Sequence, residues 1–353
     1  MAYTNIDDPS AHFQTALYTG DGSAHSIGND GNSDLKPDWV WIKKRSASGN
    51  HSVFDSTRGV YEELVTNGTN AEASDVQLLT QFDTDGFTVG TNSGVNGSGA
   101  TFVGWQWKAN GGTTSSNTDG ATTSTVQANT DAGFSIVTWT GTGSATTLGH
   151  GLGVAPAVLI VKNRSTAVDW AVYHKDLTDA GYVLQLNTAD GEVDSGTNRW
   201  NHTDPTSSVF SVGSGQQTNQ SSNNMVCYAF AEKQGYSKFG SYTGNGTAND
   251  GPFVYLGFKP AFVIIKSLAA TGAHYLWDTK RNTFNGADDT VNAAEADAET
   301  SNGIMTVDIL SNGFKIKNTG ANNGTNQSGT KYVYYAWAEN PFVTSTGIPT
   351  TAR

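Results

Sequence analysis

The sequence predicts an all-β fold made of three tandem antiparallel β-sandwich modules. Two observations predict this fold: the composition is that of a folded, turn-rich chain, and four short signatures recur three times in the same order. The 353 residues include 41 glycines and 9 tryptophans, and only 15% are charged. So many glycines indicate frequent tight turns, and so many large aromatic residues are not typical of a disordered chain.

Each of the four signatures reads as a strand or a strand end. The first is an aromatic residue followed by Thr-Gly-x-Gly, at 18–22, 139–143 and 242–246. The second is a proline, a short apolar run and a lysine, at 37–43, 156–162 and 260–266. The third is Gly-Phe or Val-Phe before a short strand, at 86–89, 209–212 and 313–316, and the fourth is an aromatic strand at 102–107, 225–230 and 332–337. The period of about 105 to 120 residues suits one small β domain rather than a solenoid repeat.

The second signature predicts the central strand of each module. Trp39, Trp41 and Lys43 alternate with Val40 and Ile42, so that both faces of this strand carry apolar side chains. A strand that is apolar on both faces is expected to be covered on both sides. The aromatic residues of the fourth signature also share one face at matched positions, which favours a core over a ligand platform. They are Trp105, Trp107, Tyr228, Phe230, Tyr335 and Trp337.

The positions of the signatures predict the domain boundaries. We expect an N-terminal docking segment at 1–17, module 1 at 18–110, a linker at 111–132, module 2 at 133–235, module 3 at 236–341 and a C-terminal tail at 342–353. The linker is rich in Gly, Thr, Ser and Asn, which is typical of a flexible connection or a strap on the surface. The short junction between modules 2 and 3 predicts a rigid pair. Short helices are conceivable at 59–64 and 291–299, although neither has a sustained apolar stripe.

Charge and cysteine content exclude several classes of function. The net charge of −12 repels phosphate, so we expect no nucleic-acid partner, and the apolar runs are too short for membrane insertion. The N-terminal residues lack the basic region and apolar core of a secretion signal. The single cysteine, Cys227, lies in an apolar run, which favours a buried thiol and rules out an intrachain disulfide.

No catalytic arrangement in the sequence is more convincing than its structural interpretation, so we expect no enzyme, no metal and no cofactor. Paired carboxylates can hydrolyse glycosides, but the available clusters lie in polar stretches that are typical of solvated loops. These clusters are Glu62 with Glu63, Asp288 with Asp289, and Glu295 with Asp297 and Glu299.

The candidate ligand contacts are three aromatic residues and two Asp–Arg pairs. Trp170, Trp200 and Tyr275 have no clear match in the other modules, and Trp200 lies in a polar stretch that suits a surface loop. An exposed aromatic face can pack against the apolar side of a sugar ring. The pairs Asp55–Arg58 and Asp278–Arg281 keep the same spacing and predict either a braced loop or a ligand contact. Module 2 has 174–177, His-Lys-Asp-Leu, at this place.

The repeated motifs resemble a module of virion structural proteins from marine bacteriophages, tail-fibre-like in character. The resemblance rests on Tyr-Thr-Gly-x-Gly, on Asp-x-x-Arg, on Gly-Phe-Lys-Pro-Ala-Phe-Val-Ile-Ile-Lys at 257–266 and on Tyr-Tyr-Ala-Trp-Ala-Glu-Asn-Pro-Phe at 334–342. It covers nearly the whole chain, and the third copy is closest. Module 1 lacks the Ala-x-Ala-Glu ending and module 2 lacks Asp-x-x-Arg. The resemblance implies concanavalin-like or jelly-roll sandwiches and a place in the virion, and it supplies no catalytic residues.

The expected function is that of a tail fibre or receptor-binding protein that contacts host cell-surface polysaccharide. Its expected partners are other virion proteins and further copies of itself, with a trimer favoured because fibres of this kind are commonly trimeric. Repeated sandwiches would present their loops in many copies, and weak sites gain from avidity. The alternative is a capsid decoration protein or head fibre on the capsid surface, bound to the shell through 6–17. A polysaccharide-degrading spike would need an acidic pair in a groove.

Overall fold

The computed structural model describes residues 2–269, 272–301, 303–318 and 324–351. The chain is all-β, as the sequence predicts, with many antiparallel strands and only single-turn helices among the described residues. None of the described helices is long and apolar enough to cross a membrane.

Module 1 is a sandwich of a six-stranded sheet, in the order β1-β9-β3-β4-β5-β6, and a three-stranded sheet, β2-β8-β7. Its elements are η1 (Pro9–Ala11), β1 (Phe13–Thr19), β2 (His25–Ile27), β3 (Trp39–Lys44), β4 (His51–Asp55), β5 (Gly59–Val65), β6 (Ala73–Ser74), β7 (Leu79–Phe82), β8 (Phe87–Val89), α1 (Ser93–Asn96) and β9 (Thr101–Trp107).

Module 2 repeats this plan with a larger main sheet, in the order β10-β11-β12-β19-β14-β15-β16-β17, and a two-stranded sheet, β13-β18. Its elements are β10 (Ser115–Asn117), β11 (Ser124–Asn129), β12 (Phe134–Thr140), β13 (Thr146–Gly149), β14 (Val158–Asn163), β15 (Ala171–His174), β16 (Tyr182–Gln185), β17 (Val193–Asp194), β18 (Val209–Val212), α2 (Gln216–Asn219) and β19 (Asn224–Phe230).

Module 3 again has a six-stranded sheet, β20-β28-β22-β23-β24-β25, and a three-stranded sheet, β21-β27-β26. Its elements are β20 (Ser237–Thr243), β21 (Phe253–Tyr255), β22 (Phe258–Ser267), β23 (His274–Asp278), β24 (Asp289–Asn292), β25 (Thr300–Ser301), β26 (Val307–Leu310), β27 (Gly313–Ile316) and β28 (Lys331–Pro341).

The strands of the second signature are central and buried on both faces, as predicted. β3, β14 and β22 each pair with the fourth-signature strand on one side and with a hairpin partner on the other. One face of the large sheet packs against the small sheet of the same module. In module 1 this inner core includes Val40, Ile42, Phe54, Phe87 and Phe102.

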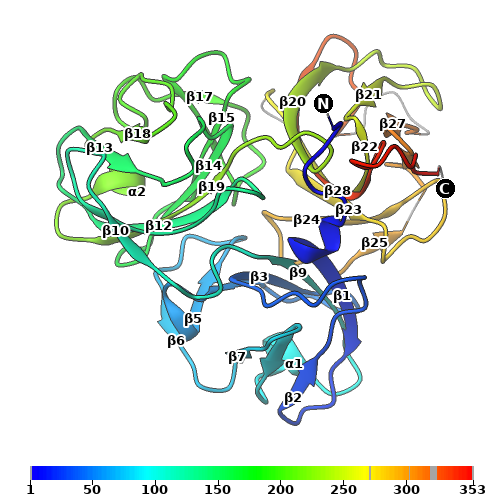
Figure 1. Cartoon of the computed structure of the whole chain (residues 1–353), viewed down its shortest axis with the longest axis horizontal. Coiled ribbons are helices and arrows are strands. Elements are labelled where there is room, and N and C mark those ends of the chain that lie inside the picture. The colour runs from blue at the N-terminus through cyan, green and yellow to red at the C-terminus, as the bar shows by residue number, and fades with distance from the viewer. Residues whose placement is uncertain (1, 270–271, 302, 319–323, 352–353) are drawn as a thin grey trace.

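The other faces of the three large sheets meet in a shared aromatic core. Rings of modules 1 and 2 stack where the centroids of Trp39 and Tyr228 lie 4.5 Å apart. Modules 1 and 3 meet at Trp105 and Phe262, 5.1 Å apart, and modules 2 and 3 meet through Phe230. Figure 1 shows the modules as three lobes around this centre. The aromatic residues of the fourth signature are therefore core residues, as predicted. This core is shared by all three modules, which are arranged around it in a closed ring.

Residues 111–132 are not a flexible linker. They contain β10 and β11, and β11 pairs with the outer edge of β12 and so extends the large sheet of module 2. Both faces of β11 are used, since Val126 joins the apolar core of module 2 and Gln127 is fully buried on the other side. Counting polar residues misses this strand because its buried polar side chains are hydrogen-bonded.

The described part of the predicted N-terminal segment, residues 2–17, is likewise packed into the body of the protein; residue 1 lies outside the described residues. Residues 13–17 belong to β1, and Phe13 and Ile6 are buried in the shared core. Ile6 to Leu17 therefore do not form a separate segment for binding a shell. Further out, Tyr3 donates a hydrogen bond of 2.6 Å to the carbonyl of Gly257.

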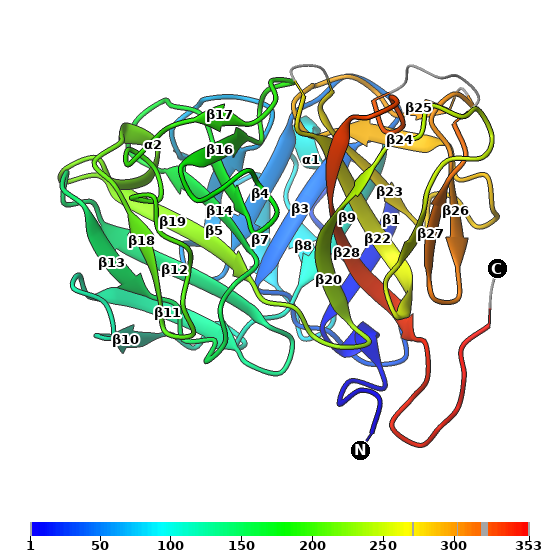
Figure 2. The same cartoon turned by 90° about the horizontal axis from the view of Figure 1, so that it is seen from above.

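The C-terminal tail packs beside the N-terminal segment, as Figure 2 shows. The backbone N–H of Ser345 donates to Asp7 at 2.6 Å, and the rings of Tyr3 and Phe342 lie 6.5 Å apart. Of the predicted tail 342–353, the last two residues lie outside the described part.

The two conceivable helices are strands and turns instead. Residues 59–64 lie in β5, which pairs with β4, and residues 291–292 end β24. The single-turn helices α1 and α2 stand at matched places before the fourth-signature strand. The side chain of Asn92 caps α1 by accepting from the N–H of Gly94.

Candidate functional site

Three equivalent interfaces close the ring. At each interface, the loop after one module's β4, β15 or β23 contacts the fourth-signature strand of the next module. At interface 1–2, Tyr228 donates a hydrogen bond of 2.7 Å to Asp55. At interface 3–1, the indole N–H of Trp105 donates to Asp278 at 3.0 Å. At interface 2–3, the rings of His174 and Tyr335 lie 5.1 Å apart.

Interface 1–2 contains a buried ionic network. Arg58 contacts the carboxylate of Asp55 through Nε and that of Glu72 through Nη1, the latter at 2.7 Å. Arg164 of module 2 also pairs with Glu72 at 2.7 Å. Burial alone would lower the pKa of Arg58, but the negative charges of Asp55 and Glu72, the contact with Tyr228 and the hydrogen bond to Glu72 together raise it above its ordinary value and keep the guanidinium ionised.

Interface 3–1 repeats the network with matched residues. Arg281 pairs with Asp278 at 2.5 Å and with Glu299 at 3.0 Å, and Arg45 of module 1 pairs with Glu299 at 2.7 Å. In both networks the Asp–Arg pair also braces its own loop, because the aspartate accepts the backbone N–H of its arginine. The two Asp–Arg pairs named by the sequence are therefore internal to the ring.

Interface 2–3 keeps the backbone contact and the glutamate, but it lacks the aspartate and both arginines. The N–H of Glu192 donates to the carbonyl of Leu268 at 3.1 Å, as Glu72 does to Arg164 and Glu299 to Arg45. Leu268 thus occupies the place of the bridging arginine. His174 occupies the place of the aspartate, and burial lowers the pKa of His174 to about 4.

One buried lysine lies at each of the three interfaces. None of the three ammonium groups has an ion-pair partner among the described residues. Each donates instead to backbone carbonyls, at least one of them in the neighbouring module. Lys43 reaches Ala296 at 2.9 Å, Lys162 reaches Thr69 at 2.8 Å, and Lys266 reaches Asp190 at 2.6 Å. Burial lowers the pKa of each lysine to about 8. The lysine of the second signature is therefore an interface residue in every copy.

The tryptophans proposed as sugar contacts are buried. Trp170 is 0% exposed and donates its indole N–H to the carbonyl of Val65 at 2.9 Å. Trp200 is 1% exposed and packs on Tyr173 in the core of module 2. The expectation that Trp200 lies on a surface loop was wrong, because the polar residues around it form turns that hold the ring inward. Neither ring has a face left for a sugar.

Tyr275 and the carboxylate clusters lie nearer the surface. The half-buried Tyr275 lines a cavity of about 200 Å³ together with Glu295 and Asp297. Glu299, the third member of that cluster, is occupied by Arg281 and Arg45. Glu63 binds Ser52, and burial raises the pKa of the Glu63 carboxyl.

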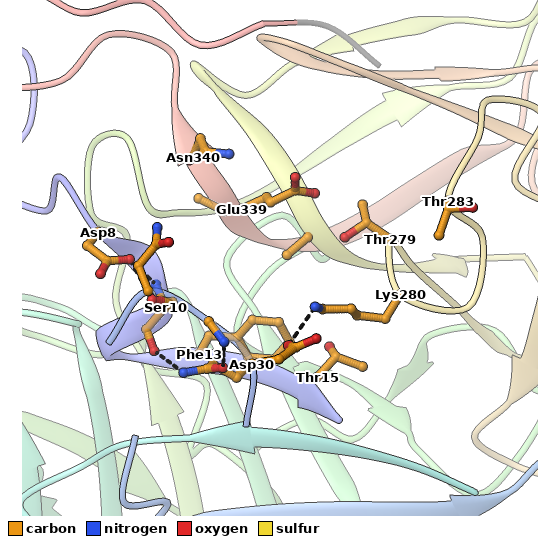
Figure 3. Close-up of a pocket in the computed structure, with 15 residues that line it drawn as sticks. Asp8, Ser10, Phe13, Thr15, Asp30, Thr279, Lys280, Thr283, Glu339 and Asn340 are labelled. Atoms are coloured by element: carbon orange, nitrogen blue, oxygen red, sulfur yellow. Dashed lines mark hydrogen bonds and ion pairs between the residues drawn. The ribbon is translucent and has the colours of Figure 1, made fainter. Parts of the chain in front are cut away.

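A larger cavity of about 370 Å³ opens at interface 3–1, between η1, β1 and the loop after β2 on one side and β22, β28 and the loop after β23 on the other (Figure 3). Its apolar lining is Phe13, Ala261 and Ala338. Its polar lining is Asp8, Ser10, Gln14, Thr15, Asp30, Asn32, Thr279, Lys280, Thr283, Glu339 and Asn340.

Two buried polar atoms at this cavity lack a hydrogen-bond partner among the described residues: Oγ1 of Thr15 and Oε2 of Glu339. Thr15, on β1, is 5% exposed and pairs with Trp105 on β9. The matched residues opposite Tyr228 and Tyr335 are the apolar Ile136 and Phe239. The hydroxyl of Thr15 is thus not needed by the repeated fold. Comparison of the three copies at this position was the sequence signal that could have identified it.

The cavity exists because interface 3–1 lacks a strand like β11. At interface 1–2, the side chain of Gln127 fills the matching space and donates to the hydroxyls of Ser56 and Thr57 at 3.0 and 2.8 Å. Its carbonyl oxygen accepts the N–H groups of Asn110 and Gly112. Ser56 and Thr57 match Thr279 and Lys280 in module 3. At interface 3–1, beside β1, no side chain of this kind fills the matching space, and the cavity remains open.

The charged groups of the cavity are mostly paired at its rim. Lys280 bridges to Asp30 at 2.6 Å, and Lys259 binds Oε1 of Glu339 at 2.8 Å. Burial alone would raise the pKa of Asp8, but hydrogen bonds from Ser10 and Ser33 hold it below its ordinary value. Three carboxylates against two lysines, Lys280 and Lys259, leave the cavity weakly acidic. Among the described residues, no cluster of His, Cys, Asp or Glu could hold a metal ion.

The comparisons with known proteins are few. The sequence matches no curated protein. One solved structure, the major capsid protein P2 from bacteriophage PM2, shares 11% identity with this chain at a TM-score of 0.18, over 59% of this chain and 100% of that one. Residues 8–341, which span all three modules as one unit, match a known family. The chain belongs to the family described as Domain of unknown function (DUF7483).

Proposed function

We propose that this protein is a non-catalytic structural component of a bacteriophage particle that contacts host-surface glycans, placed at the tail as a fibre or receptor-binding protein. The repeated motifs that resemble marine phage virion proteins support the phage setting. The observation that carries the structural role is the closed ring. Its buried acids and bases, including Arg58, Arg281 and Lys162, hold one module to the next.

A closed ring is suited to recognition because its surface loops stand on a rigid body. Preorganised loops lose less conformational entropy when they bind, and many copies on one particle multiply weak contacts. The three modules also reproduce within one chain the arrangement that a trimer would give. Association with further copies and with other virion proteins remains part of the proposal.

Counting copies of the chain in purified particles by quantitative mass spectrometry, against the major shell protein, tests the placement. A few to a few tens of copies, in multiples of about three or six, are expected for a tail component. On the order of hundreds of copies that track the shell lattice would overturn the tail placement in favour of a capsid decoration protein. Absence from the particle would overturn the proposal altogether.

Incubating the purified protein with host polysaccharide tests the non-catalytic part. No new reducing ends are expected over hours, whereas steady release of sugar would identify a depolymerase. The same protein, added in excess, is expected to slow adsorption of the phage to its host by occupying receptors.

A further inference from the structure

We propose that the 370 Å³ cavity at interface 3–1 binds one neutral hexopyranose unit of a glycan. This inference rests on the proposed function and assigns its contact site. It is drawn from three properties of the cavity: its orphaned polar atoms, its mixed lining and its departure from the symmetry of the ring.

The orphaned atoms indicate that a ligand group is accommodated here. A buried polar atom without a partner is costly, and native proteins satisfy nearly all such atoms. The hydroxyl of Thr15 can donate or accept, and Oε2 of Glu339 can accept. In Figure 3, Glu339 and Thr15 lie above and below the Lys280–Asp30 ion pair, and both line the same cavity.

The lining selects the chemical class. A hexopyranose has an apolar C–H face and a rim of hydroxyls, and the cavity pairs an apolar patch of Phe13, Ala261 and Ala338 with carboxylate, amide and hydroxyl groups. The volume lies at the lower end of the roughly 300–1,000 Å³ of small-molecule sites, which suits a single ring. Asp30 and Glu339 are paired with lysines, but the carboxylate of Asp8 has no such pair and would repel the carboxylate of an acidic sugar.

The symmetry of the ring supports a specific role for this cavity. The matching space at interface 1–2 is closed by Gln127, and the positions matching Thr15 are apolar in modules 2 and 3. Only interface 3–1 therefore combines an open space with a buried hydroxyl among the described residues. One glycan site per chain follows from this difference.

Ligand-observed NMR with the full chain tests the site. The probes are the methyl glycosides of glucose, galactose, mannose and N-acetylglucosamine at millimolar concentration, with methyl glucuronide as the acidic comparison. At least one neutral glycoside is expected to receive saturation from the protein, mainly on one ring face, and to bind at least tenfold more tightly than the glucuronide. Absence of binding by all four would overturn the proposal.

Two variants locate the binding. Thr15→Val keeps the shape and removes only the orphaned hydroxyl, and Thr283→Trp places a ring at the exposed mouth of the cavity. Each is expected to weaken binding about tenfold or more. The matched control is Ser135→Ala, which removes another buried, unpartnered hydroxyl away from the cavity and should leave binding unchanged. Sugar binding that survives Thr283→Trp would overturn the site.

The outcomes separate the site from the proposed function. If Thr283→Trp protein still competes for phage adsorption as well as the unmodified chain, the cavity is not the glycan site, although the protein still contacts the host. If neither protein competes while a glycoside binds the cavity, the site stands and the receptor role fails.

Discussion

At the residue scale, the two Asp–Arg pairs show how the ring tolerates buried charge. Arg58 and Arg281 have fully buried side chains, and each is enclosed by an aspartate, a glutamate and backbone carbonyls. Removing one charged partner from such a cluster destabilises the fold strongly, whereas replacing all of its charges by neutral side chains can leave stability nearly unchanged. Module 2 already has a neutral version, with His174 and Leu177 in the places of the pair.

Arg58→Leu should therefore lower the free energy of unfolding by about 3–5 kcal/mol, because it leaves the buried carboxylate of Asp55 without its cation. The double variant Asp55→Asn with Arg58→Leu should lose less, since the amide can still accept from Tyr228 and no uncompensated charge remains. Urea unfolding of Arg58→Leu, of Asp55→Asn and of the double variant measures the three losses of free energy of unfolding. Additive losses would show that the pair is not coupled.

His174 predicts a dependence of stability on pH. Its Nε2 donates to the carbonyl of Tyr334 at 3.3 Å and its Nδ1 accepts the N–H of Asp176 at 3.1 Å, so the neutral ring is fully bonded. Burial is the main obstacle to a second proton, and Lys175, Lys331 and the neighbouring His274 also oppose it. The charge of Asp176 and the hydrogen bond to the carbonyl of Tyr334 favour it.

Because the pKa of His174 falls to about 4 in the fold and is near 6.5 in the unfolded chain, the unfolded state takes up the proton first. The stabilising contribution is complete above pH 6.5 and is lost as the pH falls towards 4, by up to about 1.4 kcal/mol per pH unit. His174→Gln, which can keep both bonds, should give a shallower fall between pH 6.5 and 5 in urea unfolding. An unchanged slope would show that His174 is protonated in the fold.

At the element scale, β11 shows what the sequence could and could not predict. The strands of the four signatures were predictable because apolar and aromatic residues alternate there with a period of two. β11 was not, because it buries Gln127, whose burial depends on donors and acceptors from residues 56–57 and 110–112. The cavity was missed for a related reason: Thr15 is unremarkable until the register aligns it with Ile136 and Phe239.

Gln127→Leu should lower the free energy of unfolding by about 2–3 kcal/mol, because the N–H groups of Asn110 and Gly112 lose their acceptor. Those two amides should also exchange faster with solvent deuterium. Gln216→Leu, at an exposed position on α2, is the control and should change stability by less than about 0.5 kcal/mol. Equal effects of the two substitutions would contradict the sealing role of Gln127.

At the scale of the whole molecule, each large sheet has two apolar faces, but the small sheet of its own module covers only one of them. Trp39 and Trp41 are buried by neighbouring modules, whereas Val40 and Ile42 are buried by the small sheet of their own module. The alternation predicted that both faces are covered. It could not tell that the second cover is the rest of the ring, because a period of two identifies faces and not their partners.

This arrangement predicts that the modules do not fold independently. Isolated module 3, residues 236–341, would expose Phe262, Tyr335 and Trp337 on one face, a patch that soluble monomers rarely show. It should self-associate on size exclusion, whereas the full chain should unfold in urea in one transition by both tryptophan fluorescence and circular dichroism. A monomeric module 3 that unfolds cooperatively would mean that each sandwich is stable alone, and that the aromatic core only docks finished modules.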